Sequence, residues 1–295
     1  RSWSFLDEES TRVPIVISAI FSLGLVGLVF AFLLETRGLL LASLGGTLLL
    51  STSSLQFFPI TQNADTPLAY YYLATTGLLY LFTQFPQKRF LVLAGIMAGL
   101  SGWTKNEGLV FLAGSTLVLL IYFINQTKQI SSSLTKLLPY IAGWSVPGII
   151  ILFFKTQLAS ANDMSTGITF QQMVQQLLDG SRYWSILKEF FKIIYAINIL
   201  EISFIVWVLV LLLLIGKKDP NKSGVLVVLA IMMVTLLGYF AIYLITPHPL
   251  VWHLNYSADR LLYHLLPITW LIVCFNTHSL GIKHTKIGAG DITIK

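Results

Sequence analysis

Long apolar stretches are the feature that most limits what this chain can fold into. A helix needs about 20 apolar residues to cross a bilayer, and a helix covered by its neighbours can be shorter. The chain contains nine such stretches, at 13–34, 38–58, 67–85, 90–103, 108–124, 137–154, 199–215, 225–246 and 261–275. The sequence therefore predicts an all-α fold, a polytopic transmembrane helix bundle with nine spans.

The composition supports this class. Hydrophobic residues make up 55% of the chain and charged residues 11%, and the mean hydropathy is +0.77. A soluble domain carries about 25% charged residues. The values exclude a soluble globular enzyme, a disordered chain and a disulfide scaffold.

The two short stretches 90–103 and 108–124 are either two spans or one broken helix. The loop before them contains Lys88 and Arg89, and the loop after them contains Lys128. Basic loops collect on one side of a membrane, so the chain should return to the side that it left. Two short spans satisfy this condition.

Alternate loops then separate by charge. One set carries 11 basic and 3 acidic residues, and the other carries 8 basic and 10 acidic residues. The positive-inside rule predicts that the first set is cytoplasmic, together with the tail 276–295. We accordingly interpret the net charge of +6 as attraction to anionic lipid and expect no nucleic-acid partner. The expected outer segments are 1–12, 59–66, 104–107, 155–198 and 247–260.

The outer segment 155–198 is long and patterned. Apolar residues recur at helical spacing on either side of Gly180, which predicts two short amphipathic helices on the outer leaflet. They form either a small capping subdomain or a lid over a site. We assign this segment to one membrane domain, 1–275.

Polar groups are costly near a bilayer, so their clustering on the outer face is the main functional signal. Asp65 lies directly before the stretch that opens at Thr66-Pro67. It is either a cap for free backbone amides or an acidic group that binds a divalent metal or a substrate hydroxyl.

A second polar group, Lys105-Asn106-Glu107, lies at the tip between two short spans. Because these spans are short, the tip is expected near the outer headgroups. Lys105 has three donors and suits a phosphate. The structural alternative is an ion pair between Lys105 and Glu107.

The remaining polar groups lie near 247–260. His248 and His253 have no accompanying carboxylate motif, so metal ligation by the two histidines alone is disfavoured. Arg260 opens the last span and can grip two phosphate oxygens at once. A buried contact of Asp259 and Arg260 with neighbouring helices is the structural alternative.

Three runs resemble the integral-membrane glycosyltransferases of the GT-C fold. They are Ala64-Asp65-Thr66-Pro67-Leu68-Ala69, Leu100-Ser101-Gly102-Trp103-Thr104-Lys105-Asn106-Glu107-Gly108, and Thr246-Pro247-His248 through Asp259-Arg260-Leu261-Leu262. The pattern is similar to dolichyl-phosphate-mannose–protein mannosyltransferases and aminoarabinose transferases over roughly residues 1–275. Such enzymes pass a sugar from a polyprenyl-phosphate carrier to an acceptor on the outer face.

The resemblance also implies a principal acidic residue in a first outer loop. No match to that loop is found here, so we expect that an N-terminal portion is missing, and the resemblance leaves open whether this fragment is active by itself. The site residues transferred by the resemblance are Asp65 and Glu107 as catalytic carboxylates, and Arg260 and Lys105 on the donor phosphate. Supporting roles fall to Asn106, His253 and Asp259, and Asp65 is the expected ligand of a divalent metal ion.

The expected function is therefore sugar transfer from a polyprenyl-phosphate donor to a protein, lipid or glycan acceptor. The alternative is a multi-pass transporter or lipid-linked sugar flippase, which needs a polar path through the membrane. A purely structural membrane subunit is the third class. The clustering of Asp65, Lys105, Glu107 and Arg260 on one face disfavours both alternatives.

Overall fold

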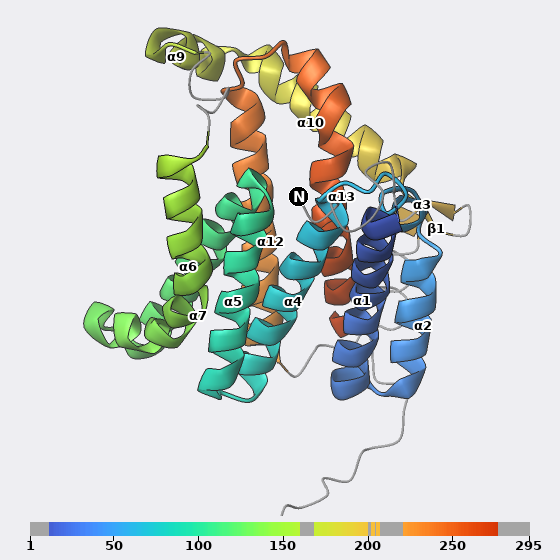
Figure 1. Ribbon diagram of the computed structural model, residues 1–295, viewed down its shortest axis with the longest axis vertical. Helices are drawn as coiled ribbons and strands as arrows, with labels where there is room; N and C mark the ends of the chain where they lie inside the picture. Colours follow the sequence, from blue (N-terminus) through green and yellow to red (C-terminus); the bar gives the residue numbers. More distant parts are fainter. Residues whose placement is uncertain (1–11, 160–167, 200–201, 204, 207–220, 277–295) are drawn as a thin grey trace, which may run out of the picture.

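The computed structural model is a helix bundle, described here for residues 12–159, 168–199, 202–203, 205–206 and 221–276 (Figure 1). In this part of the chain the only strands are β1 (Asn198–Ile199) and β2 (Ile202–Ser203), which form a small antiparallel hairpin. The helices are α1 (Arg12–Arg37), α2 (Leu39–Leu50), α3 (Ser53–Phe57), α4 (Asp65–Gln84), α5 (Lys88–Thr104), α6 (Asn106–Thr127), α7 (Ile130–Gln157), α9 (Phe170–Leu178), α10 (Gly180–Ala196), α12 (Lys222–Leu244) and α13 (Leu250–Asn276). The all-α expectation is confirmed.

Five of the described helices are long and apolar enough to cross a membrane. They lie at Val13–Arg37, Asn106–Thr127, Ile130–Gln157, Lys222–Leu244 and Leu250–Phe275. They are the helices expected of a multi-pass integral membrane protein. The prediction of nine spans is not borne out.

The stretch 38–58 is not one span. Helix α2 has 12 residues, which extend only about 18 Å, and Thr52 then takes an extended conformation before α3. The hydroxyls of Ser51 and Thr52 donate to the carbonyls of Thr47 and Leu48. Hydroxyl side chains that bond to nearby carbonyls favour such breaks. The extended Thr52 pairs with Ile199 of β1.

Two further boundaries differ from the predicted ones. The stretch 199–215 starts in the β1–β2 hairpin, and 200–201, 204 and 207–215 lie outside the described residues. Helix α13 begins at Leu250, so most of 247–260 is helix and not loop. Pro249 directly precedes it, and its carbonyl accepts from the amide of His253 in the first turn. Proline fits such a helix start because it needs no amide partner there.

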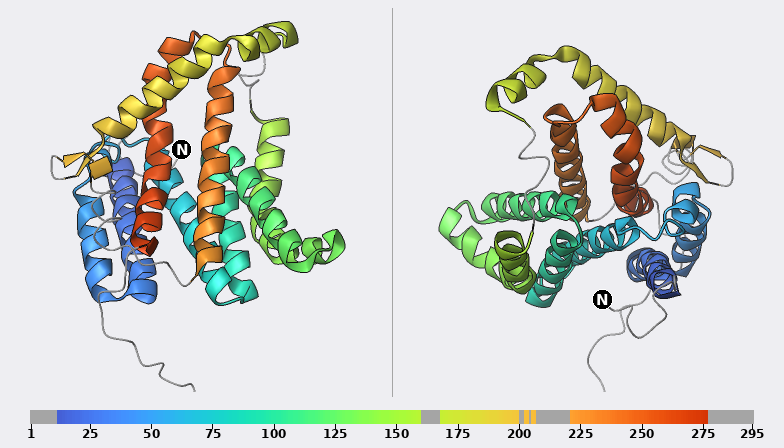
Figure 2. Two further views of the ribbon diagram at one scale, coloured as in Figure 1. Left: turned by 180° about the vertical axis from the view of Figure 1, so that it is seen from behind. Right: turned by 45° about the horizontal axis from the view of Figure 1, so that its top comes forward.

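Helices α9 and α10 occupy most of the segment 155–198, expected to hold two amphipathic helices, and α7 extends into its start as far as Gln157 (Figure 2). Helix α10 lies across α12 and α13, against which Ile186 and Phe190 are buried. Its N-cap is Asp179, which accepts from the hydroxyl and the amide of Ser181. These hydrogen bonds hold the pKa of Asp179 below its usual range.

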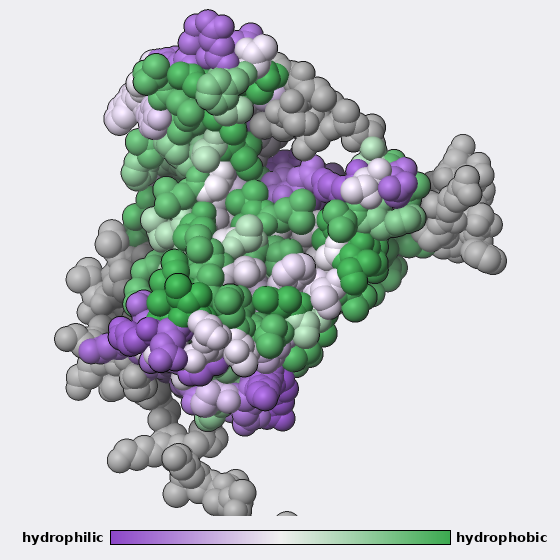
Figure 3. Space-filling view, turned by 90° about the vertical axis from the view of Figure 1, so that its left-hand side faces the viewer, coloured by the Kyte–Doolittle hydropathy of each residue, from purple (hydrophilic) through white to green (hydrophobic). Residues whose placement is uncertain are grey.

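Helix α4 lies in the middle of the bundle and packs against α1, α5, α12 and α13. Helices α4, α5, α6 and α7 alternate in direction, so their connections lie at two ends of the bundle, whereas α9 and α10 lie across one end (Figure 1). The amino end of α4 lies at the same end of the bundle as the α5–α6 connection. On the face formed by α6 and α7, a band of apolar side chains lies above a group of polar ones (Figure 3). Which end faces which compartment stays a prediction.

Candidate functional site

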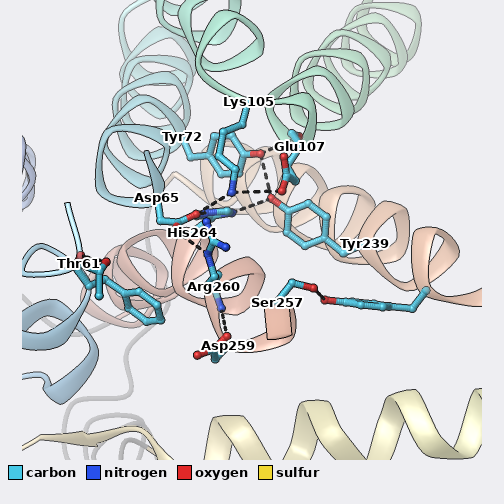
Figure 4. Close-up of polar contacts among 12 residues, drawn as sticks. Thr61, Asp65, Tyr72, Lys105, Glu107, Tyr239, Ser257, Asp259, Arg260 and His264 are labelled. Carbon is cyan, nitrogen blue, oxygen red and sulfur yellow. Dashed lines mark hydrogen bonds and ion pairs between the residues drawn. The ribbon is translucent and has the colours of Figure 1, made fainter. Parts of the chain in front are cut away.

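Asp65 is the centre of a polar cluster at one end of the bundle (Figure 4). It is the first residue of α4, and its side chain is fully buried. Its Oδ1 accepts from Lys105 Nζ at 2.8 Å and lies 2.9 Å from His264 Nε2. Its Oδ2 accepts from Arg260 Nε at 2.8 Å. No side-chain bond caps α4, so the described contacts give Asp65 a tertiary role and not that of a helix cap.

Arg260 and His264 come from α13. They are four residues apart, which places both side chains on one face of the helix. Arg260 does not open the helix as expected but lies almost three turns inside it, because α13 begins at Leu250. Its guanidinium reaches Asp65 through Nε alone. Among the described residues, no acceptor contacts its two terminal nitrogens.

The connection between α5 and α6 positions Lys105 and Glu107. Lys105 has extended backbone between the two helices, and its Nζ lies 3.2 Å from Glu107 Oε1. The connection is tight because Gly108 approaches Ser101, and a Cβ on Gly108 would lie 1.9 Å from the Ser101 carbonyl oxygen. The expected Lys105–Glu107 ion pair is therefore present, and Lys105 bridges Glu107 to Asp65.

Buried tyrosines complete the cluster. The hydroxyl of Tyr72 donates to the Glu107 carbonyl at 2.8 Å and lies 2.9 Å from the Tyr239 hydroxyl. The Tyr239 hydroxyl lies 3.3 Å from His264 Nδ1. Since an ionised carboxylate only accepts hydrogen bonds, the hydrogen on His264 Nε2 points at Asp65. The contacts form a closed ring of Asp65, Lys105, Glu107, Tyr72, Tyr239 and His264, whose members come from α4, the α5–α6 connection, α6, α12 and α13.

Exposure divides the cluster into a buried base and an open rim. The side chains of Asp65 and His264 are fully buried, whereas Lys105 is 18% exposed and Glu107 and Arg260 are each 25% exposed. Two positive charges close to one buried carboxylate favour its ionised form. The open donors of Lys105 and Arg260 can therefore bind an anion while Asp65 stays negatively charged beneath them.

A pocket of about 400 Å³ adjoins this rim at the α5–α6 connection. Lys105, Glu107, Trp103 and Phe154 are among the residues that line it. Asn106 also lines it, and its side-chain oxygen accepts from Lys155. The pocket thus joins a charged side to an aromatic side.

The expected divalent metal does not fit these residues. Asp65 uses both oxygens for Lys105, Arg260 and His264, and a metal ion would lie next to two cations. Across the described residues, no group of three or more His, Cys, Asp or Glu side chains is placed to hold a metal ion. The other carboxylate of the cluster, Glu107, already forms an ion pair with Lys105. We therefore assign no step to a metal.

Three predicted supporting residues lie outside the ring. Asn106 pairs with Lys155, and Asp259 is exposed and accepts from the backbone amide of Arg260. The His253 ring contacts the Thr246 hydroxyl at 2.8 Å and does not reach Asp65. The predicted residues that the fold brings together are Asp65, Lys105, Glu107 and Arg260.

The sequence motifs did not place His264, Tyr239 or Tyr72 in this cluster. For His264 a signal was present, because a titratable residue inside an apolar run follows Arg260 by four positions. The tyrosines carry no such signal. Other buried tyrosines in this bundle also form hydrogen bonds, so being a tyrosine in an apolar stretch does not distinguish a residue of the cluster.

No family model, curated protein or solved structure matches this chain. The resemblance to GT-C enzymes therefore depends on the sequence motifs quoted above. What the cluster does is a proposal supported by its own geometry.

Proposed function

We propose that the protein is a membrane glycosyltransferase of the GT-C type that moves a sugar from a polyprenyl-phosphate carrier to an acceptor hydroxyl. One observation supports this most directly. Lys105 and Arg260 are both bonded to the fully buried Asp65, at one end of an apolar bundle, and both keep partly exposed donors. An anionic headgroup on a lipid tail is the ligand that suits charged donors at the end of a membrane bundle.

Arg260 and Lys105 are the proposed phosphate-binding residues. The terminal guanidinium nitrogens of Arg260 can donate to two phosphate oxygens, and Lys105 Nζ adds a point charge. When the bond between the sugar and the phosphate breaks, negative charge collects on the departing phosphate. Donors fixed in advance stabilise that charge without reorganising. Asp65 acts here as a positioning residue, because both of its oxygens already accept from donors.

Glu107 is the better candidate for the base. It is partly exposed, and its side chain is held by one described partner, Lys105, at 3.2 Å. A donor phosphate that binds Lys105 competes for that ammonium group and frees the Glu107 carboxylate. The carboxylate then takes the proton of the acceptor hydroxyl as the acceptor oxygen bonds to the sugar.

The test is sugar transfer from radiolabelled polyprenyl-phosphate sugars in membranes that contain the protein. We expect transfer by the wild type, almost none by Glu107→Gln, and near-normal transfer by the matched variant Glu189→Gln, whose carboxylate pairs with Lys192 on α10. Equal transfer by Glu107→Gln and wild type would refute the base assignment. Uptake of substrate into vesicles without transfer would instead support the transporter or flippase alternative.

The proposal places the cluster on the outer face and the C-terminal tail in the cytoplasm. In a Cys274→Ser background, cysteine at Asn106 or Tyr256 should react with an impermeant thiol reagent from outside the cell. Both positions are exposed at the end of the bundle that holds the cluster. Cysteine at Arg89, at the opposite end, should not react. The reverse labelling would overturn the orientation.

A further inference from the structure

A pocket of about 670 Å³ lies at the end of the bundle opposite Asp65. It forms where the carboxyl ends of α4 and α6 meet the amino ends of α5 and α7. Its floor is apolar and contains the buried side chains of Phe82, Leu91 and Phe123. Lys88 and Lys136 lie among the lining residues and are exposed. None of these residues belongs to the cluster around Asp65.

The first part of α7 indicates where this pocket lies in the membrane. Pro139 lacks an amide hydrogen inside the helix, and α7 bends, so its amino-terminal part turns away from the bundle axis (Figure 1). Ile130, Leu134 and Leu138 follow one another at intervals of four and are 66, 47 and 56% exposed. Apolar side chains on one face of a helix that also carries serines and a lysine are typical of a helix at the membrane interface. The pocket opens beside this helix, and a helix of this pattern would place it at the depth of the lipid headgroups.

The charges around the pocket select the ligand. In the described part of the chain, neither Lys88 nor Lys136 forms an ion pair, and no acidic residue lines the pocket. Gln126 and Thr135 add neutral hydrogen-bonding groups. Two ammonium groups without a carboxylate attract an anion, whereas the apolar floor attracts a hydrocarbon chain.

We propose that this pocket binds an anionic phospholipid, with the phosphate between Lys88 and Lys136 and part of an acyl chain against Phe82, Leu91 and Phe123. Basic pockets between membrane helices bind anionic headgroups in this way. The orientation expected from the loop charges places the pocket in the cytoplasmic leaflet, where anionic lipids are found. This lipid site goes beyond sugar transfer and does not depend on it.

The test uses detergent-purified protein and native mass spectrometry with added phosphatidylglycerol and phosphatidylcholine. We expect the wild type to bind phosphatidylglycerol in preference to phosphatidylcholine. Each surface lysine contributes about fivefold to binding of an anionic lipid, so Lys88→Gln/Lys136→Gln should weaken phosphatidylglycerol binding about thirtyfold. Binding of phosphatidylcholine should not change.

The matched control is Arg89→Gln/Lys222→Gln, which removes two positive charges from the same end without touching the lining. It should leave the affinity for phosphatidylglycerol within about twofold of the wild type. An equal loss in both double variants would mean diffuse attraction and would overturn the site. Equal binding of the two lipids by the wild type would also overturn it. Displacement of phosphatidylglycerol by an equal concentration of inorganic phosphate would show a site for free phosphate instead of lipid.

Discussion

Replacing Asp65 with asparagine tests whether one buried carboxylate holds the polar cluster together. The carboxylate contacts Lys105, His264 and Arg260 at 2.8, 2.9 and 2.8 Å. An asparagine side chain has nearly the same shape but only one oxygen. Its amide group donates, so at least one of the two cations faces a donor instead of an acceptor.

The size of the effect follows from burial. A hydrogen bond to a charged group contributes about 1.5–3 kcal/mol, and breaking a fully buried ion pair costs about 3–5 kcal/mol. Lys105 and Arg260 are 18 and 25% exposed, so water can replace part of what they lose. We therefore expect Asp65→Asn to lower the free energy of unfolding by about 3 kcal/mol, which corresponds to a fall in Tm of about 5–10 °C.

Thermal unfolding in detergent measures this change, with Asp259→Asn as the matched control. Asp259 is exposed, and its carboxylate accepts from the backbone amide of Arg260. Its replacement should change stability by about 0.5 kcal/mol or less. In a double-mutant cycle, Asp65→Asn and Arg260→Gln should show a coupling energy of about 1–3 kcal/mol.

A Tm for Asp65→Asn within 1 °C of the control, which corresponds to a difference of about 0.5 kcal/mol or less, would refute this reasoning. Additive effects of the two substitutions would refute it as well, because residues that share an ion pair are coupled. Either result would mean that the two cations are positioned by the helices and not by the carboxylate.

Three further predictions test other parts of the structure. Arg260→Lys should partly reduce use of the lipid-linked donor, and Arg260→Ala should abolish it almost completely, while both proteins stay folded; donor binding and sugar transfer measure this. Tyr239→Phe should lower the free energy of unfolding by about 1–3 kcal/mol, because the lost hydroxyl contacts both a buried tyrosine and a buried histidine. The Tm of Gly95→Ala should fall well below that of Gly27→Ala. A Cβ on Gly95 would lie 2.1 Å from a carbonyl oxygen of α7, whereas a Cβ on Gly27 would have no neighbouring atom within 4 Å.

Much of the fold could be predicted from apolar stretches alone. Six of the nine predicted stretches each coincide with one helix: 13–34, 67–85, 90–103, 108–124, 137–154 and 225–246. The ends agree to within a few residues except at α7, which begins earlier, at Ile130. The stretch 38–58 is an exception, because its apolar residues continue past the break between α2 and α3. There, four consecutive hydroxyl residues at 51–54 interrupt an apolar run, and their bonds to carbonyls end α2.

The site could be predicted in part. Asp65, Lys105, Glu107 and Arg260 stand out because charged side chains are rare in this chain and all four lie beside proposed spans. That they form one cluster could not be predicted, since Asp65 and Arg260 are 195 positions apart. Only the packing of α4 against α13 brings them together.

Helix register explains why Arg260 and not Asp259 reaches the cluster. Neighbouring residues on a helix point about 100° apart, so only one of two adjacent charges can face a given partner. Periodicity normally reveals which one, but after Arg260 the helix α13 is apolar on nearly every face, and Leu261, Leu262 and Leu265 are all buried. When a helix has no polar face, its sequence does not show which side faces the interior of the bundle. The inward direction is instead marked by His264, because a buried histidine needs polar partners, and the residue one turn before it, Arg260, shares its face.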